Sequence, residues 1–239
     1  MKGDMTMKLV INADDFGYTK ANTAGIVEGY HKGIIRSTTA LCNMPYLEWG
    51  RDLAKDCADL GIGVHLTLTL GKSLTGVKTF TDGEGNFLSR KEIYAAELDA
   101  DEVYAEWKAQ IERYMEVFGR KPSHLDSHHS VHDFNEKQKA IVLRLAEEYG
   151  LHVRRYGPYQ YVAGFFGPTA TREDLLNILK ENAGKDIEIM THPGYCDLEL
   201  YRVSSYNVHR VQELDVLCSQ EVMDYVRETG IELAHYTPV

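Results

Sequence analysis

The hydrophobic residues of this chain fall into short runs rich in β-branched side chains, separated by longer stretches with apolar residues at helical spacing. Short runs of this kind are typical of buried strands. The first of them reads KLVINA, at residues 8–13. Together the runs predict strands over residues 8–13, 35–43, 61–68, 123–126, 151–154, 186–191 and 231–234.

The longer stretches predict helices over residues 19–32, 46–60, 100–118, 134–149, 172–182 and 219–228. Residues 100–118 give the clearest pattern, because Gly119 and Pro122 follow as stop signals. Large apolar residues recur there at helical spacing: Val103, Trp107, Ile111, Met115 and Phe118. Residues 78–88 contain two Gly-based turn signals and predict a hairpin or a loop.

Strands that alternate with helices predict an α/β fold with a parallel sheet. A chain of 239 residues has a length common among single β/α barrels. We therefore expect one domain over residues 1–239, built as a closed, TIM-like barrel. The active site of such a barrel lies at the C-terminal ends of its strands.

Composition narrows the classes of partner. The formal net charge of −10 argues against nucleic acid or an anionic membrane as the main partner, since both require a basic surface. Four scattered cysteines without a CxxC pair are typical of a reduced cytoplasmic protein. The start of the chain lacks the apolar segment of a signal peptide, and no run of about 18 apolar residues occurs. We expect a soluble, cytoplasmic protein.

One short segment, residues 124–132, carries four of the ten histidines together with Asp126. Imidazole and carboxylate groups are the side chains that bind a catalytic divalent metal through nitrogen and oxygen. The alternative is a polar loop whose histidines are neighbours by chance. Its position between two well-patterned segments favours the metal site.

Ionisable residues follow or lie within five predicted strands, at the edge where barrels build active sites. Each has a simpler interpretation alone: a helix cap for the aspartates, a hydrogen-bonded core residue for His65, a surface pair for Arg154 and Arg155, and a turn residue for His192. Their joint occurrence favours one site. The residues concerned are Asp14 and Asp15, His65, Asp126 with His128, Arg154, and His192.

Five motifs carry a family resemblance. They read INADDFGYTKANTAG, GVHLTLTLGKSLTG, FGRKPSHLDSHHSVH, MTHPGY and RVQELDVLCSQEV. They occur in this order and resemble the YdjC-like carbohydrate deacetylases, above all the chitooligosaccharide deacetylases among them. The resemblance implies a distorted β/α barrel, for which seven strands is one option. It also implies a metal-dependent hydrolase of chitin degradation in the cytoplasm. That hydrolase removes acetyl groups from the N-acetylglucosamine units of chitobiose, free or phosphorylated.

Carried over residue by residue, the resemblance implies metal ligands, a general base, a general acid and an arginine that orients the base. These are Asp15, His65 and His128 as ligands, Asp14 as base, His192 as acid and Arg154 as the orienting cation. The residues alone leave open which aspartate binds the metal, since neighbours on a strand point to opposite faces unless the chain bends. His192 is expected to have an ordinary pKa near neutrality. Ser130 stands where close relatives carry a further histidine, so no role is assigned to it.

The remaining assignments concern substrate and metal. His132, Asp126, Tyr195 and Tyr159 are candidates for substrate contact, although the aromatic residues are equally suited to packing on the barrel or to a homodimer interface. Arg202 and Arg210 are suited to binding a phosphate, although a place on the solvated surface is favoured for both. One divalent ion is implied, Mg²⁺ by the resemblance, whereas two imidazoles and a carboxylate suit Zn²⁺, Co²⁺ or Mn²⁺.

Two other functions remain open from the sequence. A metal-dependent phosphoesterase of a small phosphorylated metabolite would use a second metal, for which His129 and His132 are available. A non-catalytic sugar- or metal-binding protein would need neither a base nor an acid, so Asp14 and His192 argue against it. We therefore expect a small N-acetylated sugar as the substrate.

Overall fold

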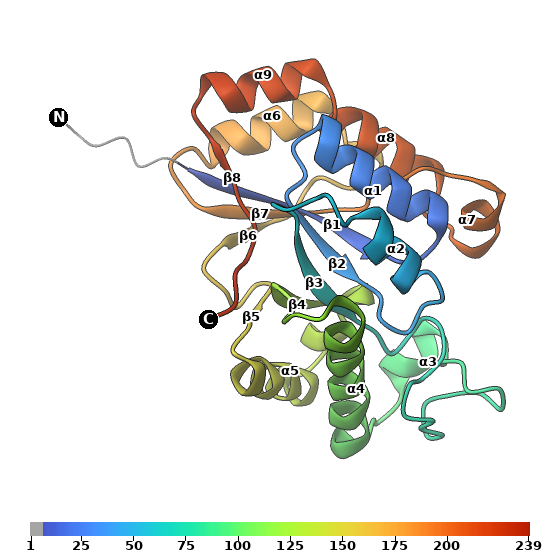
Figure 1. Cartoon of the computed structure of the whole chain (residues 1–239). Coiled ribbons are helices and arrows are strands. Elements are labelled where there is room, and N and C mark those ends of the chain that lie inside the picture. Colours follow the sequence, from blue (N-terminus) through green and yellow to red (C-terminus); the bar gives the residue numbers. More distant parts are fainter. Residues whose placement is uncertain (1–6) are drawn as a thin grey trace.

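The computed structural model describes residues 7–239, and a curved sheet of parallel strands lies at its centre (Figure 1). All seven predicted strands are present; the first is longer than predicted, the fourth is shifted by one residue and the other five are shorter. The strands are β1 (Lys8–Phe16), β2 (Ser37–Ala40), β3 (Gly61–Leu66), β4 (His124–Ser127), β5 (His152–Val153), β6 (Gln160–Val162), β7 (Ile187–Thr191) and β8 (Glu232–Leu233). Strand β6 was not predicted, because it is three residues long and lies within an aromatic loop.

The strand order is β5-β4-β3-β2-β1-β7-β6, and β8 pairs with the start of β1. The predicted parallel α/β barrel is confirmed as a curled half-barrel with helices around it. The expectation of a closed barrel was wrong. Among the described residues, β5 and β6 end the sheet and do not pair with each other.

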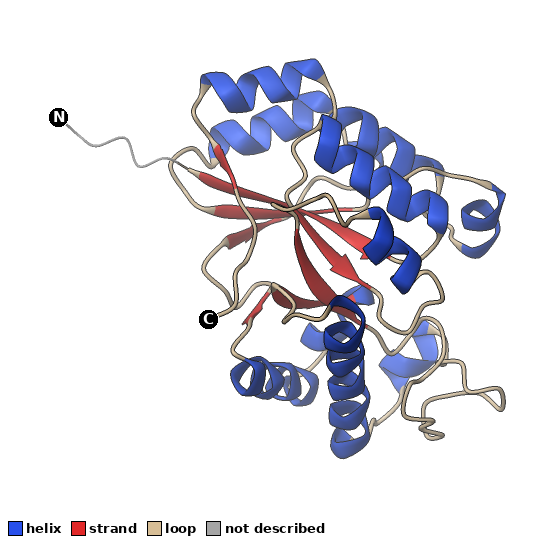
Figure 2. Cartoon of the chain, viewed as in Figure 1, coloured by secondary structure: helices blue, strands red, loops and turns tan. Residues whose placement is uncertain are grey.

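Helices surround the strands on the outside of the curve (Figure 2). The helix predicted over residues 100–118 is present with the same bounds, because Asp99 caps its start and Gly119 ends it in the left-handed conformation, at φ 64°. The helices are α1 (Lys20–Lys32), α2 (Leu47–Leu53), α3 (Arg90–Ala95), α4 (Ala100–Phe118), α5 (Glu136–Tyr149), α6 (Arg172–Glu181), α7 (Leu198–Val203), α8 (Val208–Leu217) and α9 (Gln220–Glu228), with 3₁₀ helices η1 (His128–Asp133) and η2 (Gly167–Thr169).

Two differences from the predicted helices have physical causes. Helices α3 and α7 have six residues each, too few for a periodic pattern to stand out, and α8 was also missed. Helix α2 stops at Leu53, well before residue 60. Ala54, Cys57 and Leu60 are all buried at a spacing of three, so the turns after α2 imitate the periodicity of a helix.

The C-terminal segment crosses the half-barrel at the end where the strands begin (Figure 1). The backbone N–H of Ala234 donates to Leu9 on β1, and that of Val239 donates to Gly150, just before β5. Between them the buried ring of Tyr236 stacks on His124, with the ring centroids 4.3 Å apart. This segment therefore bridges the central strand and the edge strand across the interior.

None of the helices in the described part of the chain is long and apolar enough to cross a membrane.

The close approach of α1 to the chain after β7 predicts the effect of one methyl group at Gly25. A Cβ there would lie 2.5 Å from the backbone nitrogen of Tyr195 and 2.6 Å from the Cα of Gly194. We expect Gly25→Ala to lower the free energy of unfolding in urea by about 1–3 kcal/mol, because backbone atoms must shift. Gly83→Ala is the control, since a Cβ there meets nothing within 4 Å. Equal midpoints for the two variants would contradict this packing.

Candidate active site

The chain bends at Asp15, and this bend turns two consecutive carboxylates into one cavity. Asp15 has a φ of +72°, a left-handed conformation that is uncommon for residues other than glycine. The pairing of β1 with β2 shifts register between Ala13 and Phe16. The carbonyl of Asp15 is held by the side-chain amide of Asn22, at 2.9 Å. The sequence left open whether the chain bends so that both aspartates can enter one site. The structure has this bend at Asp15.

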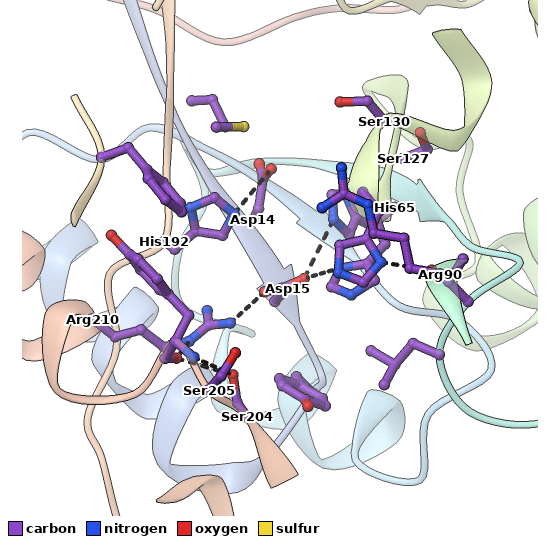
Figure 3. A pocket seen from close by; sticks show the side chains of 18 of the residues that line it. Asp14, Asp15, His65, Arg90, Ser127, Ser130, His192, Ser204, Ser205 and Arg210 are labelled. Carbon is purple, nitrogen blue, oxygen red and sulfur yellow. Dashed lines mark hydrogen bonds and ion pairs between the residues drawn. The ribbon is translucent and has the colours of Figure 1, made fainter. Parts of the chain in front are cut away.

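Asp15 meets two imidazoles on one side and a guanidinium on the other (Figure 3). Its Oδ1 lies 3.3 Å from Nε2 of His65 and 3.0 Å from Nδ1 of His128. Its Oδ2 accepts a hydrogen bond from Nη2 of Arg210, at 2.6 Å. Asp15 is fully buried, which would raise its pKa, but Arg210 and His128 hold the pKa well below its usual value. One carboxylate oxygen and two ring nitrogens thus face the same point.

These three side chains have a geometry suited to a metal ion. Their ligand atoms all lie within 4.8 Å of one another. Nδ1 of His65 lies 3.1 Å from Asp126, an acceptor that favours the hydrogen on that nitrogen and leaves Nε2 free toward Asp15. A carboxylate behind the second nitrogen is the usual support of a metal-bound histidine. Asp15, His65 and His128 therefore fit a divalent ion.

Arg154 is a buried cation surrounded by three carboxylates. Its guanidinium donates to both oxygens of Asp14, at 2.7 and 3.0 Å, and its Nε donates to Glu188 at 2.8 Å. Its Nη1 also lies 2.7 Å from Asp126. The bidentate contact fixes the orientation of Asp14. Glu188 in turn accepts a hydrogen bond from the hydroxyl of Tyr236, at 2.5 Å.

His192 follows β7 and lies on the side of Asp14 away from the metal triad, with its Nε2 3.9 Å from Asp14 Oδ2 (Figure 3). Its backbone N–H donates to the buried carboxylate of Glu213 on α8. Burial lowers the pKa of His192 to about 4, although the charges of Asp14 and Asp15 act in the opposite direction. The expected pKa near neutrality was wrong.

A cavity of about 700 Å³ opens above these groups, which is within the usual range for small-molecule sites. Polar side chains and Arg90 line it beside His128, while aromatic rings line it beside His192. Its lining includes Asp14, Asp15, His65, His128, His192, Arg210, Arg90, Tyr94, Ser127, Ser130, Phe166 and Tyr206.

The structure does not bring the four predicted substrate-contacting residues to the cavity lining. His132 is buried against Ser127, with 2.5 Å between Nδ1 and Oγ, and Asp126 is buried behind His65 and Arg154. The hydroxyl of Tyr159 donates to the carbonyl of His235, near the C-terminal segment. Tyr195 lies beside Glu28 of α1, at the outer surface. None of these four residues lines the cavity, and their contact with a substrate stays a prediction.

Sequence reasoning missed three buried charged residues. Arg210 is 2% exposed, so its expected place on the surface was wrong. It belongs, with Glu213, to the helix α8 that was not predicted. Glu188 had a usable signal, since a glutamate within the apolar run IEIMT requires a buried partner. Arg154 is that partner.

Comparisons with known proteins agree with the fold and identify the family of the chain. A family model described as YdjC-like protein matches residues 8–228. A protein named carbohydrate deacetylase from Clostridium beijerinckii is 38% identical over 98% of this chain and 100% of its own length. One of the same name from Enterococcus faecalis is 37% identical over 96% of this chain and 97% of its own.

Solved structures are also similar to this chain. An Enterococcus faecalis protein whose name refers to cellobiose-phosphate cleavage has a TM-score of 0.90 and 37% identity, over 97% of this chain and 98% of that one. A family 4 carbohydrate esterase from Streptomyces lividans has a TM-score of 0.56 at 10% identity, over 96% and 92% of the two chains, and shares the fold alone. The half-barrel is thus a fold that a carbohydrate esterase also has. This chain is a member of the YdjC-like family, and the predicted resemblance and enzyme class are confirmed at that level.

The buried arginine predicts a large difference between two adjacent positions. Arg154→Met would leave three buried carboxylates without their cation, so we expect the free energy of unfolding to fall by about 3–5 kcal/mol. Arg155→Met is the matched control. Arg155 pairs with Asp133 at the surface, with 35% of its side chain exposed, so its loss should cost less than about 1 kcal/mol. Urea denaturation of both variants measures the difference, and equal losses would refute the role of Arg154.

Proposed function

We propose that residues 1–239 form one metal-dependent N-deacetylase domain that releases acetate from the N-acetylglucosamine units of small chitooligosaccharides. The observation that carries the proposal is the placement of two adjacent aspartates in different settings. Asp15 faces His65 and His128, whereas Asp14 lies between Arg154 and His192. A metal triad beside a base and an acid is an arrangement that can hydrolyse an amide.

The arrangement of the donor atoms favours a site for one metal ion rather than two. Asp15, His65 and His128 would hold it through one oxygen and two nitrogens, since the second oxygen of Asp15 already binds Arg210. Asp14, His65 and Asp126 form a second group with ligand-like spacing. The guanidinium of Arg154 lies 2.7 Å from both carboxylates of that group, where a second cation would have to bind. This argues against a two-metal phosphoesterase.

The residues divide the reaction between them. A divalent ion in the triad would polarise the acetamide carbonyl and lower the pKa of a water molecule. Asp14, oriented by Arg154, accepts the proton of the attacking water. His192 gives a proton to the departing amine through Nε2, which lies 3.9 Å from Asp14. Because burial keeps His192 neutral at pH 7, its Nε2 first accepts from Asp14 the proton that Asp14 removed from water, and then passes that proton to the amine.

The substrate class follows from the relatives and the cavity. Curated relatives are named carbohydrate deacetylase, and a cavity of about 700 Å³ accommodates a disaccharide-sized ligand. Arg90 at its rim supplies a cation suited to a phosphorylated form of the disaccharide. Free cysteines at all four positions accord with a cytoplasmic location.

Two variants separate metal binding from turnover. We expect His128→Ala to lose the metal, measured by elemental analysis after gel filtration. Asp14→Asn should retain the metal but lose about 10²–10⁴ in kcat for acetate release from diacetylchitobiose or its phosphate. His31→Ala, at the end of α1 and outside the site, is the control. Loss of metal in Asp14→Asn would mean that the two aspartates have exchanged roles. Absence of acetate release by the unaltered protein would refute the proposed function.

The donor set also predicts metal preference. Two imidazoles and one carboxylate oxygen suit Zn²⁺ or Co²⁺, whereas Mg²⁺ prefers oxygen ligands. We expect calorimetric titration of the chelator-treated protein to give a dissociation constant for Zn²⁺ at least about tenfold lower than for Mg²⁺. Tighter binding of Mg²⁺ would contradict the assignment of the two histidines as ligands.

A further inference from the structure

An aromatic wall borders the cavity on the side of His192. The rings of Phe166 and Tyr206 are stacked, with centroids 4.5 Å apart and 17° between their planes. The ring of Phe166 also meets His192 edge-on, at 5.5 Å and 77°. Both aromatic residues line the cavity. Phe166 is 47% exposed, so a large apolar ring lies open to whatever occupies the cavity.

This wall is fixed relative to His192. The hydroxyl of Tyr206 accepts the backbone N–H of Gly167 at 2.7 Å and donates to Glu213. The other oxygen of Glu213 accepts the backbone N–H of His192. The ring of Tyr206 also stacks on His209, with centroids 5.3 Å apart, so Phe166 forms the outer layer. The carboxylate of Glu213 thus holds the aromatic wall and His192, the proposed acid, in a fixed relative position.

The other aromatic rings of the lining are not open in the same way. Tyr94 packs on Phe134, with centroids 4.4 Å apart, and the guanidinium of Arg90 lies 5.3 Å from its ring centroid. Tyr18 is only 6% exposed, and its hydroxyl donates to the carbonyl of Val203. Of the aromatic residues that line the cavity, Phe166 has the most exposed ring.

We propose that Phe166 is the platform for the sugar ring that carries the acetamide. The inference rests on the proposed function, in which the amine leaves toward His192. The ring bonded to that amine then lies on the same side of the cavity as Phe166. The C–H face of a pyranose packs on an aromatic face, whereas an open-chain polyol has no rigid apolar face to present. The site thereby selects closed sugar rings over open-chain acetamides.

The test compares a ring with an open chain bearing the same acetamide. Acetate release is measured for diacetylchitobiose and for N-acetylglucosaminitol, the reduced open-chain form of N-acetylglucosamine. Phe166→Ala should raise KM for diacetylchitobiose about five- to tenfold with little change in kcat, and leave the open-chain compound unaffected. Phe166→Trp should retain the low KM. Tyr201→Ala, which removes a 62% exposed ring outside the cavity lining, is the control and should match the unaltered protein.

An equal effect of Phe166→Ala on both compounds, or none on either, would overturn the platform. Saturation-transfer NMR separates this failure from failure of the proposed function. If the unaltered protein releases no acetate, saturation of its aromatic protons should still reach the ring protons of diacetylchitobiose, and Phe166→Ala should weaken that transfer. Absence of transfer in the unaltered protein would exclude the platform whatever the reaction is.

Discussion

The half-barrel depends on one buried guanidinium. Arg154, which follows β5, contacts Asp14 of β1, Asp126 of β4 and Glu188 of β7. In the strand order, β5 and β7 lie on opposite sides of β1, and no backbone hydrogen bonds close the sheet between β5 and β6. The ion pairs therefore cross the interior and join strands that the open sheet leaves apart. Buried charges are stable only when they are paired in this way.

The same arrangement gives two neighbouring, chemically identical residues different tasks. Both oxygens of Asp14 bind Arg154, while Asp15 divides its oxygens between Arg210 and the two histidines. The left-handed backbone at Asp15 makes the separation possible, because it turns both carboxylates toward the cavity but along different directions. Their roles thus follow from their partners, and each partner comes from a different part of the chain.

The sequence predicted the features that local patterns encode. The five-turn helix α4 was predicted to the residue. The strand ends placed five site residues at one edge: Asp14, Asp15, His65, His128 and His192.

The features that the sequence did not predict depend on contacts between distant parts of the chain. Arg210 meets Asp15 across 195 positions, and its helix was not recognised. Of the histidine run, only His128 was assigned to the metal, and the structure places it beside Asp15, whereas His124 stacks on Tyr236 and His132 is buried. The barrel was expected to be closed, but β5 has only two residues and does not pair with β6.

The C-terminal segment has a consequence for the order in which the molecule is built. Tyr236 donates its hydroxyl to Glu188, and Glu188 holds Arg154, which orients Asp14. During translation, Asp14 emerges from the ribosome long before Tyr236, which lies far downstream in the chain. Until Tyr236 has emerged, Glu188 has no access to the hydroxyl that donates to it in the folded protein. The base on β1 therefore acquires its final surroundings only when synthesis has passed Tyr236.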